Sequence, residues 1–271
     1  MKVAVLGTGK MGAAAARRLD AQGFDTLIWN RTRERAEAVG AGRVMDSPRT
    51  AAAQADVVIS ILTGPQAVRD VYGSLEPSGR TVYLEMSTAG PEVPEQLAEG
   101  FPTLVAAPVI APPAKVEAGE ALFLAGGAQS AVDRARPVFE ALGEVRYVGT
   151  YRRAAAMKLM NNTMLAVTIA AAAELVEAGV RNGLTADEAF EWMRRHAPYL
   201  ETRRSAYLGG PYEPLTFALR DIVKDVDLAL AMFNGPDYPM PIVDAVREAF
   251  AEVMSEHGDK ELTAVIERYR R

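Results

Sequence analysis

Three polar residues interrupt an otherwise apolar helical stretch and could carry proton chemistry. Lys158, Asn161 and Asn162 lie near the start of a predicted helix over residues 154–182, and their i, i+3 and i+4 spacing places them on one helical face. Partial desolvation there lowers the pKa of a lysine toward neutrality, so its ammonium could donate a proton to a carbonyl oxygen. The alternative is a lysine whose head reaches water beside two asparagines that bond locally.

A second candidate site lies at the start of the chain. Gly7, Gly9 and Gly12 have G-x-G-x-x-G spacing directly after the apolar, strand-like residues 2–6. In a dinucleotide-binding turn the first glycine allows the tight turn, the second lets the backbone approach a pyrophosphate, and the third lets the next helix pack closely. That helix offers free N–H groups and a positive dipole end to the anion. A glycine-rich turn of another α/β protein is the alternative, and the strand–helix–strand context favours the nucleotide site.

The end of the second predicted strand bears on the choice of nucleotide. Residues 26–29 are followed by Asn30, Arg31 and Thr32, with no carboxylate to bind a free ribose 2′-hydroxyl. Arginine and small polar groups suit a 2′-phosphate, so NADP(H) is favoured over NAD(H). The alternative is that Arg31 and Arg33 only open the next helix as solvated charges.

Composition excludes several classes of function. The 271 residues are 49% hydrophobic and carry a net charge of −5, with scattered Lys and Arg, which argues against nucleic acid as a partner. No cysteine is present, and the two histidines are too few and too isolated to suggest a metal site. Residues 163–173 are far short of the roughly 20 needed to span a bilayer, and the first residues do not look like a signal peptide. We therefore expect a cytoplasmic protein with no membrane partner.

The order of predicted elements divides the chain into two domains. Over residues 1–152, strand-like runs alternate with helical stretches, which predicts a mostly parallel, doubly wound α/β sheet of the Rossmann type. Over residues 153–271 the pattern becomes helical, with Gly183 closing the first helix and Thr185 and Glu188 forming a capping box for the second. The predicted strands are 2–6, 26–29, 57–62, 81–85, 103–106, 121–125 and 145–148. The predicted helices of the second domain are 154–182, 185–196, 217–234 and 241–257, with a final one from 260.

Five motifs, taken in order, resemble those of the β-hydroxyacid dehydrogenases. They are the glycine turn, the segment 87–92 that begins Ser87-Thr88, the run Ala107-Pro108-Val109, the run 158–162, and Lys224-Asp225. The family includes 3-hydroxyisobutyrate dehydrogenase and the glyoxylate and semialdehyde reductases, and the resemblance covers essentially the whole chain. It implies a Rossmann domain, a long interdomain helix, an all-helical C-terminal domain like that of 6-phosphogluconate dehydrogenase, and a homodimer or homotetramer.

The resemblance also assigns roles to individual residues. Lys158 would be the general acid in reduction and the base in oxidation, and Asn162 would orient the substrate or the lysine. Ser87 would contact a substrate carboxylate, and Lys224 would lie near both substrate and cofactor, although each could instead be an ordinary cap or a solvated charge. The cofactor would contact Gly7, Thr8, Gly9, Lys10, Met11, Gly12, Asn30, Arg31, Thr32, Leu62, Thr63, Thr88 and Lys224.

The chain departs from the family pattern at two places. Where the family has Ser-Gly-Gly to hold a substrate carboxylate, the chain reads Ile110-Ala111-Pro112-Pro113, which predicts a bulkier or less polar substrate at that point. Where the family has Gly-x-Gly, the chain has Arg152 and Ala154. We expect Arg152 or Arg153 to supply a replacement anion contact, and the alternative is a charged hinge facing water.

These patterns together favour an NADP(H)-dependent oxidoreductase of a small β-hydroxy acid or semialdehyde-type carbonyl. Two alternatives stay open. An imine reductase shares the architecture but typically lacks the catalytic lysine. A protein that binds NADPH as a sensor or scaffold, without turnover, would not need Lys158 and Asn162.

Overall fold

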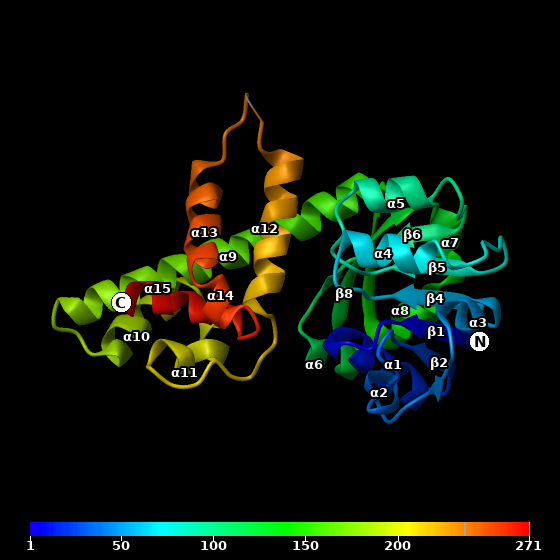
Figure 1. The fold of residues 1–271 in the computed structure, drawn as a ribbon, viewed down its shortest axis with the longest axis horizontal. Helices are drawn as coiled ribbons and strands as arrows, with labels where there is room; N and C mark the ends of the chain where they lie inside the picture. The colour runs from blue at the N-terminus through cyan, green and yellow to red at the C-terminus, as the bar shows by residue number, and fades with distance from the viewer. Residues whose placement is uncertain (236, 271) are drawn as a thin grey trace. The chain divides into compact units, whose positions relative to one another are not determined.

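The computed structural model describes residues 1–235 and 237–270 as two compact units. The first comprises Met1–Lys158 and the second Leu159–Arg271, so the division falls inside the long helix α9 (Tyr151–Arg181). The boundary predicted after residue 152 lies within the same helix. The elements of each unit can be followed along the chain in Figure 1.

The first unit is built on a nine-stranded sheet whose spatial order is β3-β2-β1-β4-β5-β6-β8-β7, with β9 beside β8. Six strands from β3 to β6 run parallel, whereas β8 is antiparallel to both β6 and β7. The strands are β1 Lys2–Leu6, β2 Asp25–Trp29, β3 Arg43–Val44, β4 Val57–Ser60, β5 Val82–Glu85, β6 Leu104–Ala106, β7 Val109–Ile110, β8 Ala121–Gly127 and β9 Gly143–Gly149. The mostly parallel, doubly wound sheet confirms the predicted fold class.

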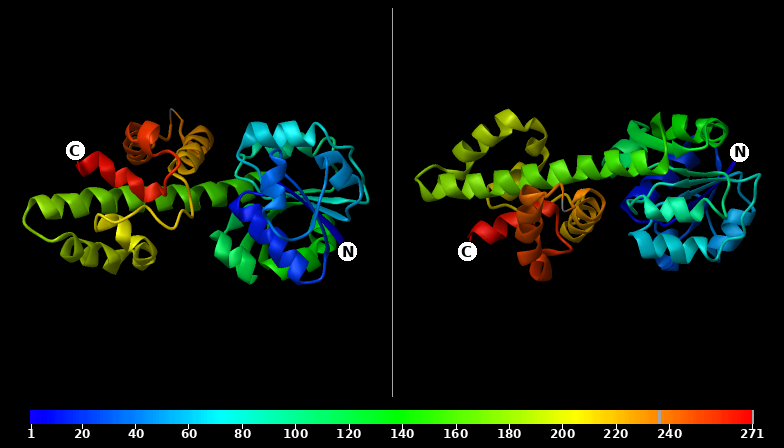
Figure 2. Two further views of the ribbon diagram at one scale, coloured as in Figure 1. Left: turned by 60° about the horizontal axis from the view of Figure 1, so that its bottom comes forward. Right: turned by 90° about the horizontal axis from the view of Figure 1, so that it is seen from above.

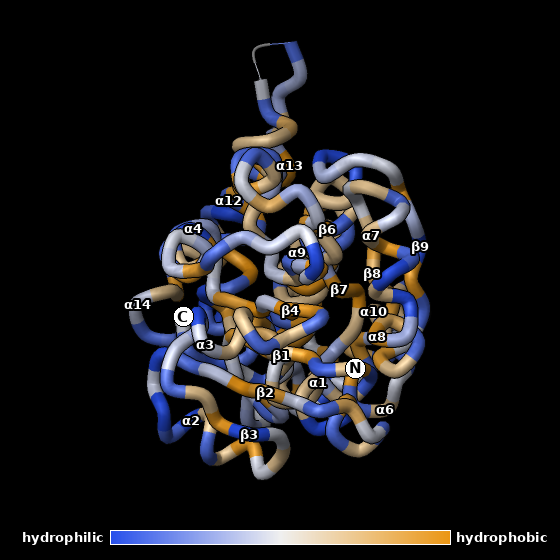
Figure 3. Tube along the Cα trace, turned by 90° about the vertical axis from the view of Figure 1, so that its right-hand side faces the viewer, coloured by the Kyte–Doolittle hydropathy of each residue, from blue (hydrophilic) through white to orange (hydrophobic). Residues whose placement is uncertain are grey.

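Both faces of this sheet are covered, as the apolar strands require. Val3 and Val5 belong to one apolar cluster and Ala4 and Leu6 to another, so alternate residues of β1 point to opposite faces. Helices α1 (Lys10–Ala21), α6 (Pro113–Ala118), α7 (Gln129–Arg134) and α8 (Arg136–Leu142) contribute side chains to the first cluster. Helices α3 (Pro48–Ala53), α4 (Pro65–Tyr72) and α5 (Glu92–Leu97) supply the second. Figure 3 shows the hydrophobic β1 in contrast to the hydrophilic α2 (Arg33–Glu37).

The second unit is helical, and Figure 2 shows its helices packed along α9. Its apolar core includes Ile169, Phe190, Ile222 and Phe250. Its elements are the remainder of α9, α10 Ala186–His196, the 3-10 helix η1 Pro198–Arg203, α11 Arg204–Tyr207, α12 Leu219–Phe233, α13 Pro241–Glu252, α14 Met254–His257, η2 Leu262–Ile266 and α15 Glu267–Arg270.

The predicted elements agree with these bounds except at short pieces. All seven predicted strands are present, whereas the two-residue β3 and β7 carry no sequence pattern long enough to detect. The predicted helix 241–257 is interrupted at Val253, which separates α13 from α14, and the helix expected from 260 is η2 followed by α15. The capping box is confirmed, because Thr185 Oγ1 accepts from the Glu188 N–H while Glu188 Oε2 accepts from the Thr185 N–H.

Helix α9 is long and apolar enough to cross a bilayer by length and composition alone. The core helix of a soluble protein passes the same test, and 39% of the most apolar window of α9 is buried. Several residues of α9, including Ala166, Ile169 and Val176, lie in the core of the helical unit. This packing is that of a core helix.

Candidate functional site

The glycine turn between β1 and α1 has the close packing that its sequence predicts. Gly7 has a φ of +95°, and a Cβ built there would lie 2.3 Å from the backbone oxygen of Ile61. A Cβ on Gly12 would lie 1.8 Å from the backbone oxygen of Gly7, so helix α1 can pack against the turn only without a side chain. Neither position therefore accepts a larger residue.

Space for a ligand remains at the tip of this turn. A Cβ on Gly9 would meet no atom within 4 Å, and Gly9 is the N-cap of the twelve-residue helix α1. Next to it, the buried hydroxyl of Thr8 has no hydrogen-bond partner among the described residues. Lys10 is exposed, whereas Met11 packs partly against the core and would offer its backbone. An open glycine, an unpartnered hydroxyl and a helix N-terminus fit the pyrophosphate of a dinucleotide.

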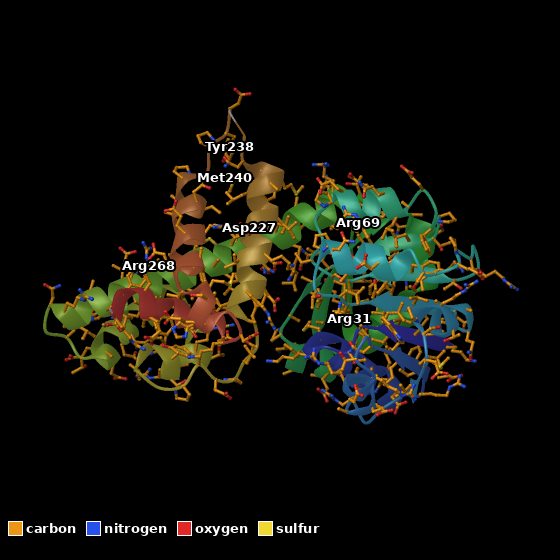
Figure 4. All side chains as sticks on the ribbon, viewed as in Figure 1. Arg31, Arg69, Asp227, Tyr238, Met240 and Arg268 are labelled. Carbon is orange, nitrogen blue, oxygen red and sulfur yellow. The ribbon has the colours of Figure 1, made fainter. Side chains whose placement is uncertain are left out.

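Asn30 connects this turn to the end of β2. Its Oδ1 accepts from the Thr8 N–H at 3.1 Å, and its Nδ2 donates to the Thr32 carbonyl at 2.9 Å. Arg33 is held by Glu37 at 2.8 Å and by Asp46 at 2.9 Å. The exposed Arg31, labelled in Figure 4, has no ion pair in the described part of the chain. Arg31 therefore differs from Arg33 in being available to an anion at the carboxyl end of β2.

A buried hydrogen-bond chain joins the ends of β4 and β5. Glu85, the last residue of β5, is 2% exposed and accepts from the Ser87 N–H at 2.8 Å. The Ser87 hydroxyl accepts in turn from the Leu62 N–H at 2.9 Å, which fixes the loop that carries Leu62 and Thr63. The proton of that hydroxyl is not used in this bond, so it could still donate to a ligand. Burial, with the added charge of Glu85, raises the pKa of Tyr72 nearby.

Lys158 lies against the segment that departs from the family pattern. Its Nζ donates to the Val109 carbonyl of β7 at 2.8 Å. The half-buried Ile110 follows, and Pro112 and Pro113 are the N-cap and first residue of α6. Neither proline has an N–H group, so this turn lacks two donors that could otherwise hold an anion. A backbone carbonyl can hold the ammonium of Lys158 in place without neutralising its charge.

The polar cluster lies in the helical unit and consists of Asn161, Asn162, Lys224 and Asp225. The Asn162 side chain, 3% exposed, donates from Nδ2 to Asp225 Oδ2 at 2.5 Å and accepts from Asn161 Nδ2 at 3.0 Å. The Lys224 ammonium lies 2.5 Å from Asp225 Oδ1. The two predicted residues Asn162 and Lys224 are thus joined through one buried carboxylate.

The remaining predicted residues are placed on or near surfaces. Arg152 is exposed and lies 3.8 Å from Glu92 and 3.6 Å from Glu95 of α5, so any anion would have to compete with two carboxylates. Arg153 is also exposed. Thr88 is half-buried beside Ser87. The anion contact at Arg152 stays a prediction.

Two residues that complete these contacts had no predicted role. In the sequence, Glu85 is noticeable only as a single charged residue at the end of an apolar strand, and Asp225 only as the neighbour of Lys224 in its motif. Neither feature predicts the buried hydrogen bonds that these two carboxylates accept. Among residues 1–235 and 237–270, no group of three or more His, Asp or Glu side chains is placed to hold a metal ion.

Comparison with known families agrees with this arrangement over nearly the whole chain. Residues 2–151 match the model of the NAD binding domain of 6-phosphogluconate dehydrogenase. Residues 153–269 match the model described as NAD-binding of NADP-dependent 3-hydroxyisobutyrate dehydrogenase. The two matches meet inside helix α9.

Individual relatives are similar over their full length. Glyoxylate/succinic semialdehyde reductase 1 of Arabidopsis thaliana is 30% identical, over 98% of each chain. The 3-hydroxyisobutyrate dehydrogenase of Pseudomonas aeruginosa is 28% identical, over 99% of this chain and 98% of the relative. The solved Mycobacterium tuberculosis 3-hydroxyisobutyrate dehydrogenase with L-serine has a TM-score of 0.83 and 25% identity, over 100% of this chain and 99% of that one. The chain therefore belongs to the β-hydroxyacid dehydrogenase family of NAD(P)-dependent oxidoreductases.

Proposed function

We propose that this protein is an NADP(H)-dependent oxidoreductase that interconverts a small β-hydroxy acid and a semialdehyde-type carbonyl compound. The observation that carries the proposal is the placement of Lys158, whose ammonium is bonded to the Val109 carbonyl one turn of α9 before the buried Asn162. An ammonium that is positioned by a backbone carbonyl carries protons that it can give. This is what a general acid for a carbonyl oxygen requires.

Lys158 would protonate the carbonyl oxygen in reduction and take the proton back in oxidation. The bond to the Val109 carbonyl orients the ammonium. Asn162 would orient the substrate or the lysine from the next turn of α9. The bound nicotinamide would supply hydride transfer to or from the substrate carbon.

The preference for NADP(H) is supported by the end of β2. Arg31 is exposed and has no ion pair among the described residues, whereas a carboxylate that could bind a free ribose 2′-hydroxyl is absent from residues 30–32. A guanidinium can make two hydrogen bonds to a phosphate. The glycine turn, Asn30, Leu62, Thr63 and Thr88 would hold the rest of the cofactor.

The substrate class follows from two different segments. The Ser87 hydroxyl could donate to a substrate carboxylate, and Lys224 adds an ammonium in the helical unit. Ile110, Pro112 and Pro113 add apolar surface and no N–H donor from the prolines. We expect an acidic substrate whose carbonyl carries a larger or less polar substituent than glyoxylate does.

The test is oxidation of NADPH and, separately, of NADH by a panel of carbonyl compounds. The panel comprises glyoxylate, succinic semialdehyde, methylmalonate semialdehyde, uncharged aldehydes and a cyclic imine. Fastest turnover of an acid semialdehyde with NADPH is the expected result. Activity confined to the imine would favour an imine reductase, an alternative that the altered segment 110–113 leaves open. Tight NADPH binding without turnover of any compound would instead favour the sensor.

Two further expectations belong to the same proposal. A homodimer or homotetramer is predicted from the family, and light scattering coupled to size-exclusion chromatography measures the mass directly. A cytoplasmic location is predicted from the composition, and fractionation of the source cells tests it.

A further inference from the structure

Asp225 stands between two residues of the candidate site. It lies on α12, is 2% exposed, and uses one carboxylate oxygen for Asn162 Nδ2 and the other for Lys224 Nζ. Asn162 is buried, whereas the Lys224 side chain is 28% exposed. A buried carboxylate that joins an amide to an ammonium near the accessible surface is a costly arrangement, and the apolar core does not need it.

Only a carboxylate can accept from both groups. Each oxygen of a carboxylate accepts, so the side of Asn162 that faces Asp225 has to be its NH₂ group, and the Asn162 oxygen is turned toward Asn161. An asparagine at position 225 could accept from Asn162 only by presenting its own NH₂ group to the Lys224 ammonium. Replacement by the amide would therefore either break one of the two contacts or reverse the amide of Asn162.

We infer that Asp225 is a positioning residue, which fixes the amide orientation of Asn162 and holds the ammonium of Lys224 in place. The inference rests on the proposed function for the roles of Lys158 and Asn162. Asp225 itself need not touch substrate or cofactor. The negative charge of Asp225 offsets the positive charge of Lys224. Lys224 can therefore donate hydrogen bonds without leaving a net positive charge beside Asn162.

The charge of Asp225 acts together with those of its neighbours. Asp221, one turn earlier on α12, has a pKa raised mainly by burial. Its pKa is also raised by Asp225 and Asp259 and lowered by Lys224 and Arg220. Removing the charge of Asp225 leaves Lys224 with less negative charge around it. Since Asn162 lies one turn from Lys158 on α9, the excess positive charge should disfavour the protonated form of Lys158.

The experiment compares Asp225→Asn with Asp227→Asn in the full-length protein. Asp227 lies on the same helix, is exposed and pairs with Arg247 at 2.8 Å, so it is a matched carboxylate outside the cluster (Figure 4). The first readout is the pH dependence of kcat for reduction. The second is the apparent pKa of Lys158 from competitive acetylation with mass-spectrometric detection, which needs no turnover. Unfolding temperatures show whether each variant is folded.

Asp225→Asn should lower kcat about 30-fold and move the Lys158 titration to lower pH by about half a unit, whereas Asp227→Asn should change neither. Lys224→Met should move that titration in the opposite direction, because it removes a positive charge. This variant still tests the inference if Asp225→Asn does not fold.

The labelling experiment separates the inference from the proposed function. If the wild-type protein turns over no carbonyl compound but the Lys158 titration moves as expected, the proposed function is wrong and the positioning role stands. Equal titrations in wild type, Asp225→Asn and Lys224→Met would overturn the positioning role. That conclusion would hold even if carbonyl reduction were confirmed.

Discussion

The glycine turn and the polar cluster are made of different parts of the chain. The turn uses backbone atoms of neighbouring residues, and its shape depends on missing side chains at Gly7 and Gly12. The cluster uses side chains, and its central contact joins residues 63 positions apart. A backbone site is therefore sensitive to added volume, whereas a side-chain site is sensitive to lost charge or lost donors. The two sites should respond to opposite kinds of substitution.

A second buried carboxylate in the helical unit sharpens this contrast. Glu261 is also 2% exposed, but it accepts from the backbone N–H groups of Thr216 and Phe217 and pairs with Arg203 at 2.9 Å. Glu261 thus holds the loop of Thr216 and Phe217 against the start of η2. Asp225 instead holds two residues of the candidate site. Equal burial of two acids therefore does not indicate equal roles, and the partners distinguish them.

The largest expected effect is on turnover when Lys158 loses its ammonium. Lys158→Met keeps most of the side-chain length and should lower kcat about 1,000-fold, which is within the range for loss of a general acid. The dissociation constant for NADPH should change less than threefold, because the glycine turn is untouched. Steady-state kinetics measure kcat, and fluorescence titration measures the dissociation constant.

The control is Met157→Ala, because Met157 is the exposed neighbour of Lys158 in the chain. A kcat for Lys158→Met within threefold of wild type would remove Lys158 as the proton donor.

The next effect tests the backbone site by adding a methyl group at two glycines. Gly12→Ala places its Cβ against the Gly7 carbonyl and should lower the free energy of unfolding by at least about 3 kcal/mol.

A Cβ at Gly9 would meet no atom within 4 Å, and the φ of Gly9 is −66°. The free energy of unfolding of Gly9→Ala should therefore stay within about 0.5 kcal/mol of wild type. Its dissociation constant for NADPH should nevertheless rise at least about tenfold, because the methyl takes space that the pyrophosphate needs. Urea unfolding and cofactor titration separate the two outcomes. Unchanged cofactor binding in Gly9→Ala would place the pyrophosphate elsewhere.

The same distinction decides what could be predicted from sequence. The glycine turn, the long strands and the Thr185–Glu188 cap depend on residues close together in the chain, so their patterns predict them directly. The grouping of Lys158, Asn161 and Asn162 is predictable for the same reason, since helical spacing brings them to one face.

Contacts between distant residues could not be predicted in this way. Nothing in the local sequence shows that Lys158 bonds to the Val109 carbonyl, that Ser87 accepts from Leu62, or that Asp225 receives Asn162. These contacts depend on the order of strands in the sheet and on the packing of α12 against α9. The family resemblance supplied the residues of the candidate site, but the hydrogen bonds that position them came from the tertiary structure.

A smaller effect is expected for Arg31, a side chain beside the backbone site. Arg31→Ala should lower kcat/KM for NADPH about 30-fold and leave that for NADH within about twofold, because one charge-assisted contact to the 2′-phosphate is lost. Arg33→Ala is the matched control, since Arg33 is already paired with Glu37 and Asp46 and should change the ratio of the two cofactors less. Equal losses for NADPH and NADH in Arg31→Ala would contradict a role in cofactor choice.

The smallest expected effect concerns Asp221, at the edge of the polar cluster. Its pKa is raised in the folded protein, first by burial and then by Asp225 and Asp259, although Lys224 and Arg220 oppose this. The folded state therefore binds a proton more readily than the unfolded state does, so stability falls as the pH rises from about 4 through the raised pKa. Asp221→Asn removes this loss and should raise the unfolding temperature by about 1–2 °C at pH 7, after allowance for partial solvent screening.

The gain in unfolding temperature should disappear as the pH is lowered to 4. It should also be smaller in an Asp225→Asn background, where one of the charges that raise the pKa of Asp221 is gone. A gain that is the same at both pH values would mean that packing, and not charge, separates the two side chains. Scanning calorimetry of the four proteins between pH 4 and pH 7 measures this coupling between Asp221 and the cluster.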